Sequence, residues 1–157
     1  PYEGIGGIVV NWNCYGTSDV WDIPENKLMI ETLTRRMSLN DPMNFYTKMI
    51  VEPEAVNRIL NPHFAKMKKG KRLVHTDFSP LDHPISHSYS LITVNHYYTR
   101  TKKYLIEEKI KKKELMDNRQ LSEREKKFYF ETGNFEDDPE RHIFRFVPQL
   151  KEKLLQK

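Results

Sequence analysis

The sequence predicts an α/β fold, with a small mixed sheet flanked by helices and further helices at the C-terminal end. Short β-branched or apolar runs predict strands at Ile5–Trp12, at Phe45–Val51 and within Ser90–Arg100. Apolar residues at helical spacing follow each run, and strands that alternate with helices indicate an α/β arrangement. Three strands make a thin sheet, which suits the continuation of a larger one.

The first strand, Ile5–Trp12, is β-branched, and its Gly6-Gly7 pair allows another backbone to approach closely. The ten residues that follow read as a loop. Pro24 suits the first turn of a helix, with Asp22 as its N-cap. Apolar residues continue this predicted helix at Met29, Ile30, Leu33 and Met37.

The middle of the chain is predicted to hold a short helix and two polar connections. Pro53 begins the helix, which carries Val56, Ile59 and Leu60. Residues 66–72 read as a basic exposed turn. Residues 73–88 are polar and interrupted by prolines, and they contain His75, His83 and His87.

Ser90–Arg100 is the stretch around which the predicted fold is organised. Leu91, Ile92 and Val94 are strand-prone, and the run ends on Asn95-His96-Tyr97-Tyr98. A strand that presents such groups at its carboxyl end is typical of a ligand site in open α/β sheets. A histidine hydrogen-bonded inside the core is the alternative interpretation.

The C-terminal third reads as helical. One helix is expected over residues 101–116, and a second at Ser122–Phe130 with a capping box of Ser122 and Glu125. A last helical segment is expected to open at Asp138-Pro139 and to kink or break at Pro148.

Composition limits the possible classes. The 157 residues suit one domain. With 38% hydrophobic and 31% charged residues, the chain is polar for a globular domain, so we expect it to pack against a further part of a larger protein. The single Cys14 excludes an intramolecular disulfide and a cysteine-based zinc site. No apolar run has the length of a membrane span. Because the first residue is Pro1, we expect a piece of a longer protein.

Charge is concentrated in one segment. The net charge is +4, and residues 100–127 hold eleven Lys or Arg against six Asp or Glu. Such a segment attracts phosphates or anionic surfaces, whereas its interleaved acids favour a solvated helix face.

Five stretches, in order, resemble glycosyltransferase family 92. The first four are the motifs G-I-V-V-N-W-N-C-Y-G at Gly7–Gly16, L-M-I-E-T-L-T-R-R at Leu28–Arg36, K-M-I-V-E-P at Lys48–Pro53 and N-H-Y-Y-T-R-T-K-K-Y-L-I-E-E-K at Asn95–Lys109. The fifth is a closing helix at Asn134–Leu150. The resemblance implies a GT-A type fold. It also implies an inverting, metal-dependent transfer of a sugar, often galactose from UDP-galactose, onto a glycan.

Two departures from the family pattern shape this expectation. Asp19 and Val20 stand where the family has Gly and His. The family's Asp-x-Asp motif and nucleotide-binding units precede the strand matched by Ile5–Trp12, and this sequence does not contain them. The chain is therefore expected to be the C-terminal, acceptor-side half of a GT-A domain. Its expected partners are the upstream donor-binding half, a UDP-sugar and a glycan acceptor, with no nucleic acid, and it is expected to be inactive alone.

The donor side of the expected site consists of cations and a metal ligand. By the resemblance, His96 is a ligand of Mn²⁺ or another divalent cation, for which an imidazole among oxygen ligands is suitable. Arg100 stands where the family has Lys and suits the diphosphate, with Lys103 as a second cation. A structural histidine and ordinary surface cations are the alternatives.

The acceptor side is expected around the first strand. Trp12 and Tyr15 offer rings that stack on a sugar, although both ring types are more often core residues, and Gly16 permits a close backbone turn. Lys48 contacts substrate or forms an internal salt bridge. Further candidates are Asp77 as an acceptor contact and His63 and His75 as lining of the same cleft.

The general base that takes the proton of the acceptor hydroxyl is expected to be Asp19, with Asp22 and Asp77 as alternatives. Two rival functions are compatible with the sequence. The first is a nucleic-acid-binding module in which residues 100–127 bind phosphates and Tyr97, Tyr98 and Tyr104 stack on bases. The second is a carbohydrate-binding module without chemistry.

Overall fold

The structure, a computed structural model, describes residues 2–38, 40–81, 91–131 and 142–156. The chain divides into two compact units, each made of two stretches. The first unit comprises Pro1–Asn13 and Leu39–His96, and the second comprises Cys14–Ser38 and Tyr97–Lys157. A mixed sheet and several helices confirm the predicted α/β class.

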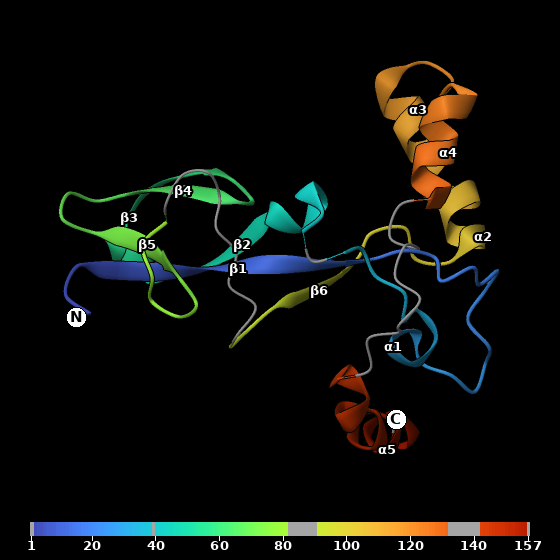
Figure 1. Ribbon diagram of the computed structural model, residues 1–157, viewed down its shortest axis with the longest axis horizontal. Helices are drawn as coiled ribbons and strands as arrows, with labels where there is room; N and C mark the ends of the chain where they lie inside the picture. Colours follow the sequence, from blue (N-terminus) through green and yellow to red (C-terminus); the bar gives the residue numbers. More distant parts are fainter. Residues whose placement is uncertain (1, 39, 82–90, 132–141, 157) are drawn as a thin grey trace. The chain divides into compact units, whose positions relative to one another are not determined.

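The sheet is built around β1 (Ile5–Tyr15), which is drawn in blue in Figure 1. On one edge β1 pairs antiparallel with β2 (Thr47–Val51), and on the other it pairs parallel with β5 (Arg72–His75). The short strand β6 (Val94–Tyr97) also pairs with β1. The predicted first strand is confirmed and continues through Asn13, Cys14 and Tyr15, which were expected in a loop.

Close packing along β1 explains its two adjacent glycines. A Cβ atom on Gly7 would lie 2.7 Å from the backbone oxygen of Ile50, and one on Gly6 would lie 2.6 Å from the Cβ of Ala55. Both distances are shorter than atoms tolerate, so a side chain at either position would force the neighbouring segments apart. Val9 and Val10 follow and are 2% and 1% exposed, so the core of this unit lies directly beyond the glycines.

The helix predicted after Pro53 is wrong. A single 3₁₀ turn, η2 (Pro53–Ala55), leads into β3 (Val56–Asn61), which pairs antiparallel with β4 (Phe64–Met67). The side chain of Asn61 explains the outcome, because its Oδ1 accepts the backbone N–H groups of His63 and Phe64 at 2.8 and 2.9 Å. This local bond closes a hairpin turn in place of a helix.

The basic turn expected at residues 66–72 is confirmed only over residues 68–71, because residues 66 and 67 belong to β4 and Arg72 begins β5. The backbone N–H of Lys71 donates to the carbonyl of Lys68 at 3.0 Å, and Gly70 has φ +80. That conformation favours glycine because a Cβ atom is strained there.

The strand expected in Ser90–Arg100 is shorter than predicted. It begins only at Val94, and Leu91 and Ile92 before it are 66% and 47% exposed. Pairing with β1 limits the strand, so the apolar run before it stays in solvent. Ser90, His83 and His87 lie outside the described residues.

The first predicted helix of the second unit is also corrected. The helix α1 spans only Met29–Thr32. Leu33 and Met37 are buried, 0% and 2% exposed, but in extended chain that runs beside the end of β1: Met37 N–H donates to the carbonyl of Cys14. Strand-like pairing thus buries side chains whose spacing suggested a helix. Asp22 does not cap α1, because its Oδ1 accepts the backbone N–H of Ile23 instead.

A continuous helical stretch confirms the prediction over residues 101–116. It consists of α2 (Lys102–Tyr104), a π-helical segment η3 (Leu105–Ile110) and α3 (Lys111–Asp117). The helix α4 (Glu123–Glu131) follows, and its predicted capping box is present. Ser122 Oγ accepts the Glu125 N–H at 3.3 Å and Glu125 Oε2 accepts the Ser122 N–H at 2.8 Å. Leu105, Ile110 and Leu121 form the core here.

The chain ends in η4 (His142–Phe146) and α5 (Val147–Leu155). Pro148 lies in the first turn of α5, where its missing N–H is harmless, so the predicted kink is wrong. The predicted start of this segment at Asp138-Pro139 lies outside the described residues. Within the described part of the chain, no helix is both long and apolar enough to cross a membrane.

We predict that Gly7→Ala destabilises the first unit by about 1–3 kcal/mol, because the added methyl group meets backbone atoms that cannot rotate away. Urea denaturation measures the free energy of unfolding. Gly70→Asn is the matched control: no atom lies within 4 Å of a Cβ added there, and asparagine tolerates positive φ. Equal effects of the two substitutions would contradict this explanation of Gly7.

Candidate functional site

Four aromatic or imidazole rings gather in the first unit. We call Trp12, Tyr46, His63 and His96 the Trp12 cluster. The centroid of the Trp12 ring lies 3.9 Å from that of His96, 5.3 Å from that of Tyr46 and 5.4 Å from that of His63. Strands β1 and β6 supply Trp12 and His96, Tyr46 precedes β2, and His63 lies in the β3–β4 turn. Three candidate residues from the sequence, Trp12, His63 and His96, are therefore brought together.

Only part of this cluster reaches solvent. Trp12 is 8% exposed, whereas Tyr46 is 51% exposed, and His63 and His96 are half-buried. The expectation that Trp12 stacks on a sugar is corrected, because its ring is covered. Tyr46, which no sequence motif singled out, presents the open ring of the cluster. Sequence reasoning could not identify Tyr46, because a backbone hydrogen bond from the Trp12 N–H to the Tyr46 carbonyl places it in the cluster. This bond forms only when the strands are paired.

The hydrogen bonding of His63 fixes its tautomer. Nδ1 lies 2.7 Å from the backbone oxygen of Thr47. A carbonyl oxygen only accepts, so Nδ1 carries the proton and Nε2 is left as an acceptor in the neutral ring. Nε1 of Trp12 is buried and, among the described residues, has no hydrogen-bond partner. The cluster thus combines one acceptor nitrogen with one unsatisfied donor.

Lys48 finds its partner in this cluster. It lies opposite Val10 in the β1–β2 register, and its Nζ is 5.7 Å from the centroid of the Trp12 ring. This is a cation–π contact. The predicted internal salt bridge does not form within the described part of the chain, where Lys48 has no carboxylate within ion-pair distance. A positive charge therefore lies beside the rings.

Asp77 and His75 lie in the same unit but serve local structure. Oδ1 of Asp77 accepts the backbone N–H of Ser79 at 3.0 Å and its hydroxyl at 2.6 Å, in the turn after β5. His75 is the last residue of β5 and is 2% exposed. The expectation that His75 lines a cleft is therefore wrong. Asp77 is exposed, and its role as an acceptor contact stays a prediction.

Asp19 lies in the second unit at the centre of an ion-pair network. Ser18 and Asp19 both have positive φ, 51 and 61, and form a tight turn after β1. Oδ2 of Asp19 binds Arg35 at 2.8 Å, and Oδ1 binds Lys102 at 3.0 Å. The side chain is 57% exposed. These contacts account for its position, and its role as a general base stays a prediction.

The two cations expected to bind a diphosphate have partners within the second unit. Lys103 pairs with Asp22 at 2.9 Å. This hydrogen bond lowers the pKa of Asp22 and raises the pKa of Lys103. The Arg100 guanidinium lies 4.5 Å from the centroid of the Tyr104 ring. A diphosphate would have to compete with the Asp22 carboxylate for Lys103. Arg100 stacks on the Tyr104 ring, and this contact leaves its charge available to a diphosphate.

Tyr15 and Gly16 occupy buried positions. The Tyr15 ring is 1% exposed and stacks on Tyr97, with ring centroids 5.0 Å apart. It offers no open face to a sugar, so the predicted stacking role of Tyr15 is corrected to a core role. The N–H of Gly16 donates to the Arg35 carbonyl at 3.2 Å, which holds the chain where it leaves β1.

Lys109 is a chemically unusual residue to which its sequence motif assigned no role, although it is the last residue of that motif. Its amine donates to the Tyr98 carbonyl and lies 3.2 Å from the Tyr98 ring centroid and 5.6 Å from that of Tyr129. Burial lowers the pKa of Lys109 to about 8. Its place in the π-helical segment η3 adds to its interest, because such segments are frequent at functional sites.

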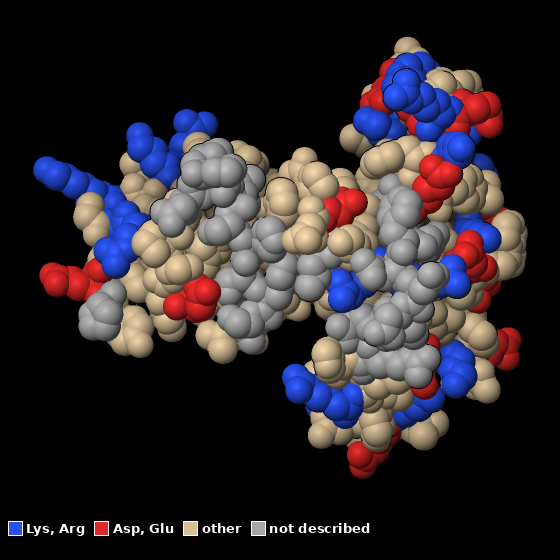
Figure 2. Space-filling view, in the orientation of Figure 1, with Lys and Arg blue, Asp and Glu red and all other residues tan. Residues whose placement is uncertain are grey.

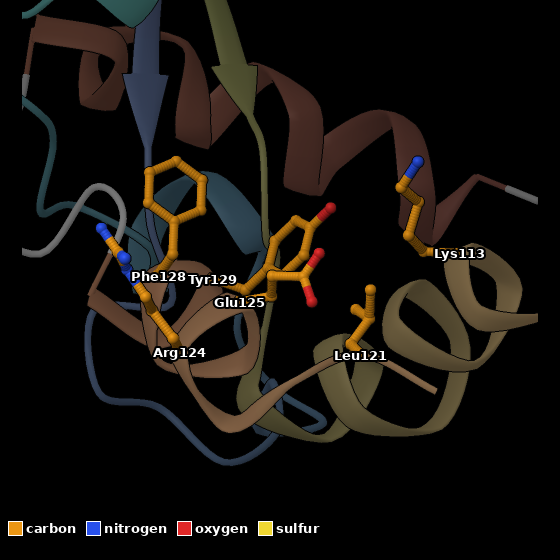
Figure 3. A pocket seen from close by; sticks show the side chains of 6 residues that line it. All are labelled: Lys113, Leu121, Arg124, Glu125, Phe128 and Tyr129. Atoms are coloured by element: carbon orange, nitrogen blue, oxygen red, sulfur yellow. The ribbon is translucent and has the colours of Figure 1, made fainter. Parts of the chain in front are cut away.

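A small cavity of about 280 Å³ opens between α3 and α4 in the second unit (Figure 3). Its apolar wall consists of Leu121, Phe128 and Tyr129, and its charged wall of Lys113, Arg124 and Glu125. In Figure 3, Arg124 and Phe128 lie beside each other on α4, one turn apart. None of the predicted site residues lines it, although four of its six lining residues fall within the charged segment 100–127.

The described residues do not provide a manganese site by themselves. No three His, Cys, Asp or Glu side chains within them lie close enough together to hold a metal ion. Mn²⁺ takes an octahedral set of mainly oxygen ligands, and His96 would give one imidazole. The metal expected from the family resemblance therefore stays a prediction that requires ligands from outside this set.

Comparisons with known proteins add no relative: the chain matches no family model, no curated protein and no solved structure. The glycosyltransferase resemblance rests on the five sequence stretches.

We predict that neutral His63 exists as the Nδ1–H tautomer, because the Thr47 carbonyl requires a donor. Long-range ¹H–¹⁵N NMR spectra distinguish the two ring nitrogens directly. A histidine in a short unstructured peptide serves as the reference, since free imidazole favours the Nε2–H form. An Nε2–H signal from His63 would contradict the hydrogen bond on which the site is built.

We predict that Lys109 makes the protein more stable relative to Lys109→Met as the pH rises from 8 to 10. Its pKa is about 8 in the folded chain against an ordinary 10.5. Between these values the unfolded chain binds the proton that the folded chain has released, so the free energy of unfolding increases with pH. Urea denaturation at several pH values gives the difference.

Lys113→Met is the control for this pH dependence. Asp117 raises the pKa of Lys113, so the stabilisation by Lys113 is constant below pH 10. If both variants show the same pH dependence, Lys109 does not have the lowered pKa.

Proposed function

We propose that this chain is the acceptor-side half of a glycosyltransferase, which moves a sugar, galactose as the first candidate, from a UDP-sugar onto a glycan. The observation that supports it is the Trp12 cluster, in which the half-exposed Tyr46 ring lies beside the His63 imidazole, and the His96 imidazole and the Lys48 ammonium lie beside Trp12. Sugars have an apolar C–H face and a polar rim. A flat ring with hydrogen-bonding groups at its edge is suited to both.

Each residue of the cluster has a task in this proposal. Tyr46 stacks on the acceptor sugar, and Nε2 of His63 accepts a hydrogen bond from one of its hydroxyl groups. Lys48 lies beside the Trp12 ring and donates to a second sugar oxygen. Trp12 packs against the other three rings of the cluster and holds them in place. Positioning of this kind lowers the entropy cost of bringing acceptor and donor together.

His63 is also a candidate for the general base, alongside the predicted Asp19. Its Nδ1–H is bound to a backbone carbonyl, which holds the ring with Nε2 turned away from the backbone. In the transfer, the base takes the proton of the acceptor hydroxyl while that oxygen bonds to the anomeric carbon. The bond from this carbon to the nucleoside diphosphate breaks, and the diphosphate leaves with the electron pair. The configuration at the anomeric carbon is inverted.

The donor side of the proposal depends on parts outside this chain. The UDP-sugar, the divalent cation and its carboxylate ligands belong to the upstream half, to which His96 would add one imidazole. A divalent cation neutralises the charge of the leaving diphosphate when it is bound. The chain alone is therefore expected to bind an acceptor glycan and to transfer nothing.

A second candidate function is a carbohydrate-binding module without chemistry. The internal ion pairs of Asp19 and Lys103 favour it, because both predicted catalytic-side groups already have partners. The nucleic-acid alternative has less support. Most of the charged residues expected to hold phosphates pair with carboxylates, namely Lys102, Lys103, Lys113, Arg119, Lys126 and Lys127.

The test is glycan binding by the purified chain, which saturation-transfer NMR measures with galactose-, mannose- and N-acetylglucosamine-terminated oligosaccharides. Tyr46→Ala is expected to weaken binding about tenfold, since a stacked ring contributes about 0.5–1.5 kcal/mol beyond its buried area. Tyr2→Ala is the matched control, because Tyr2 is a 63% exposed tyrosine of the same unit outside the cluster. Equal loss in both variants, or no binding at all, contradicts the proposal.

Transfer activity separates the two carbohydrate functions. The chain joined to its upstream half is expected to transfer a sugar in the presence of Mn²⁺, and His96→Ala is expected to abolish turnover with the fold intact. Retained glycan binding with no transfer by the joined protein selects the binding module.

A further inference from the structure

A second surface of the first unit carries charges that the proposed function does not use. Between Glu54 and Asp77 the sequence contains no acidic residue, and it contains six basic residues: Arg58, Lys66, Lys68, Lys69, Lys71 and Arg72. They belong to β3, β4, the turn that follows β4 and the first position of β5. Figure 2 shows Lys and Arg side chains gathered over this part of the first unit.

Most of these charges have no ion-pair partner among the residues that the structure describes. Lys71 approaches Glu52 at 3.9 Å, and the Arg72 guanidinium donates to the Glu3 carbonyl at 3.0 Å. The other four have no ion pair or hydrogen bond to the side chain among the described residues: Arg58, Lys66, Lys68 and Lys69. The contrast with the paired cations of residues 100–127 is clear. The cations of the hairpin are available to an external anion.

Two of these charges face each other across the hairpin. The β3–β4 register places Arg58 directly opposite Lys66. Like charges at opposite positions of an antiparallel pair destabilise it. An anionic surface placed against both residues removes this cost, so the pair is informative about what binds there.

The same hairpin exposes large apolar side chains. Ile59, Leu60 and Phe64 are 56%, 58% and 51% exposed, and they flank the Asn61-Pro62 turn. The side of the hairpin that packs inward is different: Ala55 is 1% exposed, Met67 lies against Gly6, and His63 contacts Trp12. The hairpin is therefore anchored through Ala55, His63 and Met67, while the residues near its turn and its basic side chains are exposed.

We propose that the β3–β4 hairpin (Val56–Met67), with the Lys68–Arg72 turn, docks on the surface of an anionic lipid bilayer. Ile59, Leu60 and Phe64 enter the boundary between headgroups and acyl chains, and the unpaired cations contact lipid phosphates and carboxylates. Peripheral membrane binding commonly combines these two contributions, apolar insertion and attraction between basic residues and anionic lipids. A soluble polyanion such as RNA would use the charges and leave the three apolar side chains in water.

The test is co-sedimentation of the full chain with vesicles of phosphatidylcholine containing about 30% phosphatidylserine, compared with vesicles of phosphatidylcholine alone. The chain is expected to bind the anionic vesicles, with binding that weakens as salt rises from about 50 to 500 mM because screening shortens the reach of the charges. Equal binding to both vesicle types, or to neither, overturns the proposal.

The charge contribution is tested with the double variant Lys68→Glu/Lys69→Glu. Each basic residue near an anionic membrane contributes roughly a fivefold change in partitioning, so at least a tenfold loss is expected. Lys111→Glu/Lys112→Glu in α3 is the matched control, with the same charge change at two exposed positions of the second unit. A control loss as large as the hairpin loss shows attraction by net charge alone and overturns the proposal.

The apolar contribution is tested with Leu60→Ser/Phe64→Ser. At least a tenfold loss is expected, with the remaining binding still dependent on salt. The matched control is Leu115→Ser/Met116→Ser, two apolar residues of the second unit that are 82% and 73% exposed. Circular dichroism confirms that each variant is folded.

Two results of these variants point to other occupants and overturn the bilayer assignment. Loss on the lysine substitutions with none on the apolar substitutions indicates a soluble polyanion, which RNA binding then verifies. Self-association that the apolar substitutions abolish, without vesicle binding, indicates a second copy of the chain on this surface.

Discussion

Backbone pairing on both edges of β1 is the constraint on which most of the candidate site depends. The antiparallel register with β2 places Lys48 opposite Val10, two residues before Trp12. Pairing with β6 brings His96 to the Trp12 ring. Because Gly6 and Gly7 lack side chains, the neighbouring segments lie close enough for these contacts to form. The chemistry of the cluster is thus set by main-chain hydrogen bonds.

Features decided by local sequence were predictable. The β-branched run at Ile5–Trp12 is a strand, and the Ser122 and Glu125 capping box forms as expected, because each is determined by neighbours within a few residues. Features decided by pairing partners were not. Leu33 and Met37 have helical spacing, yet chain that runs beside β1 buries them. The hairpin at Val56–Met67 is a different case, because the local turn closed by the Asn61 side chain stands where the apolar spacing suggested a helix.

The candidate site shows the same division. Trp12, Lys48, His63 and His96 were selected from the sequence, and they lie together. Tyr46 completes the cluster from a position that only the folded strands determine. Asp19, Tyr15, Gly16, Arg100 and Lys103 belong to the second unit, where contacts within that unit account for each. Sequence identifies a reactive side chain, but its neighbours decide whether it is available.

The π-helical segment η3 has a consequence for how this helix tolerates changes in length. Leu105 and Ile110, its first and last residues, are both buried in one core. Five residues apart in a regular α-helix, they would point about 140° away from each other. The wider turn absorbs the surplus residue and aligns them. Removing one of the four residues between them leaves the two apolar anchors four apart, the spacing that an ordinary α-helix aligns unaided. A chain shortened by one residue here keeps its buried contacts, so loss of a single codon is a change that this helix can accommodate.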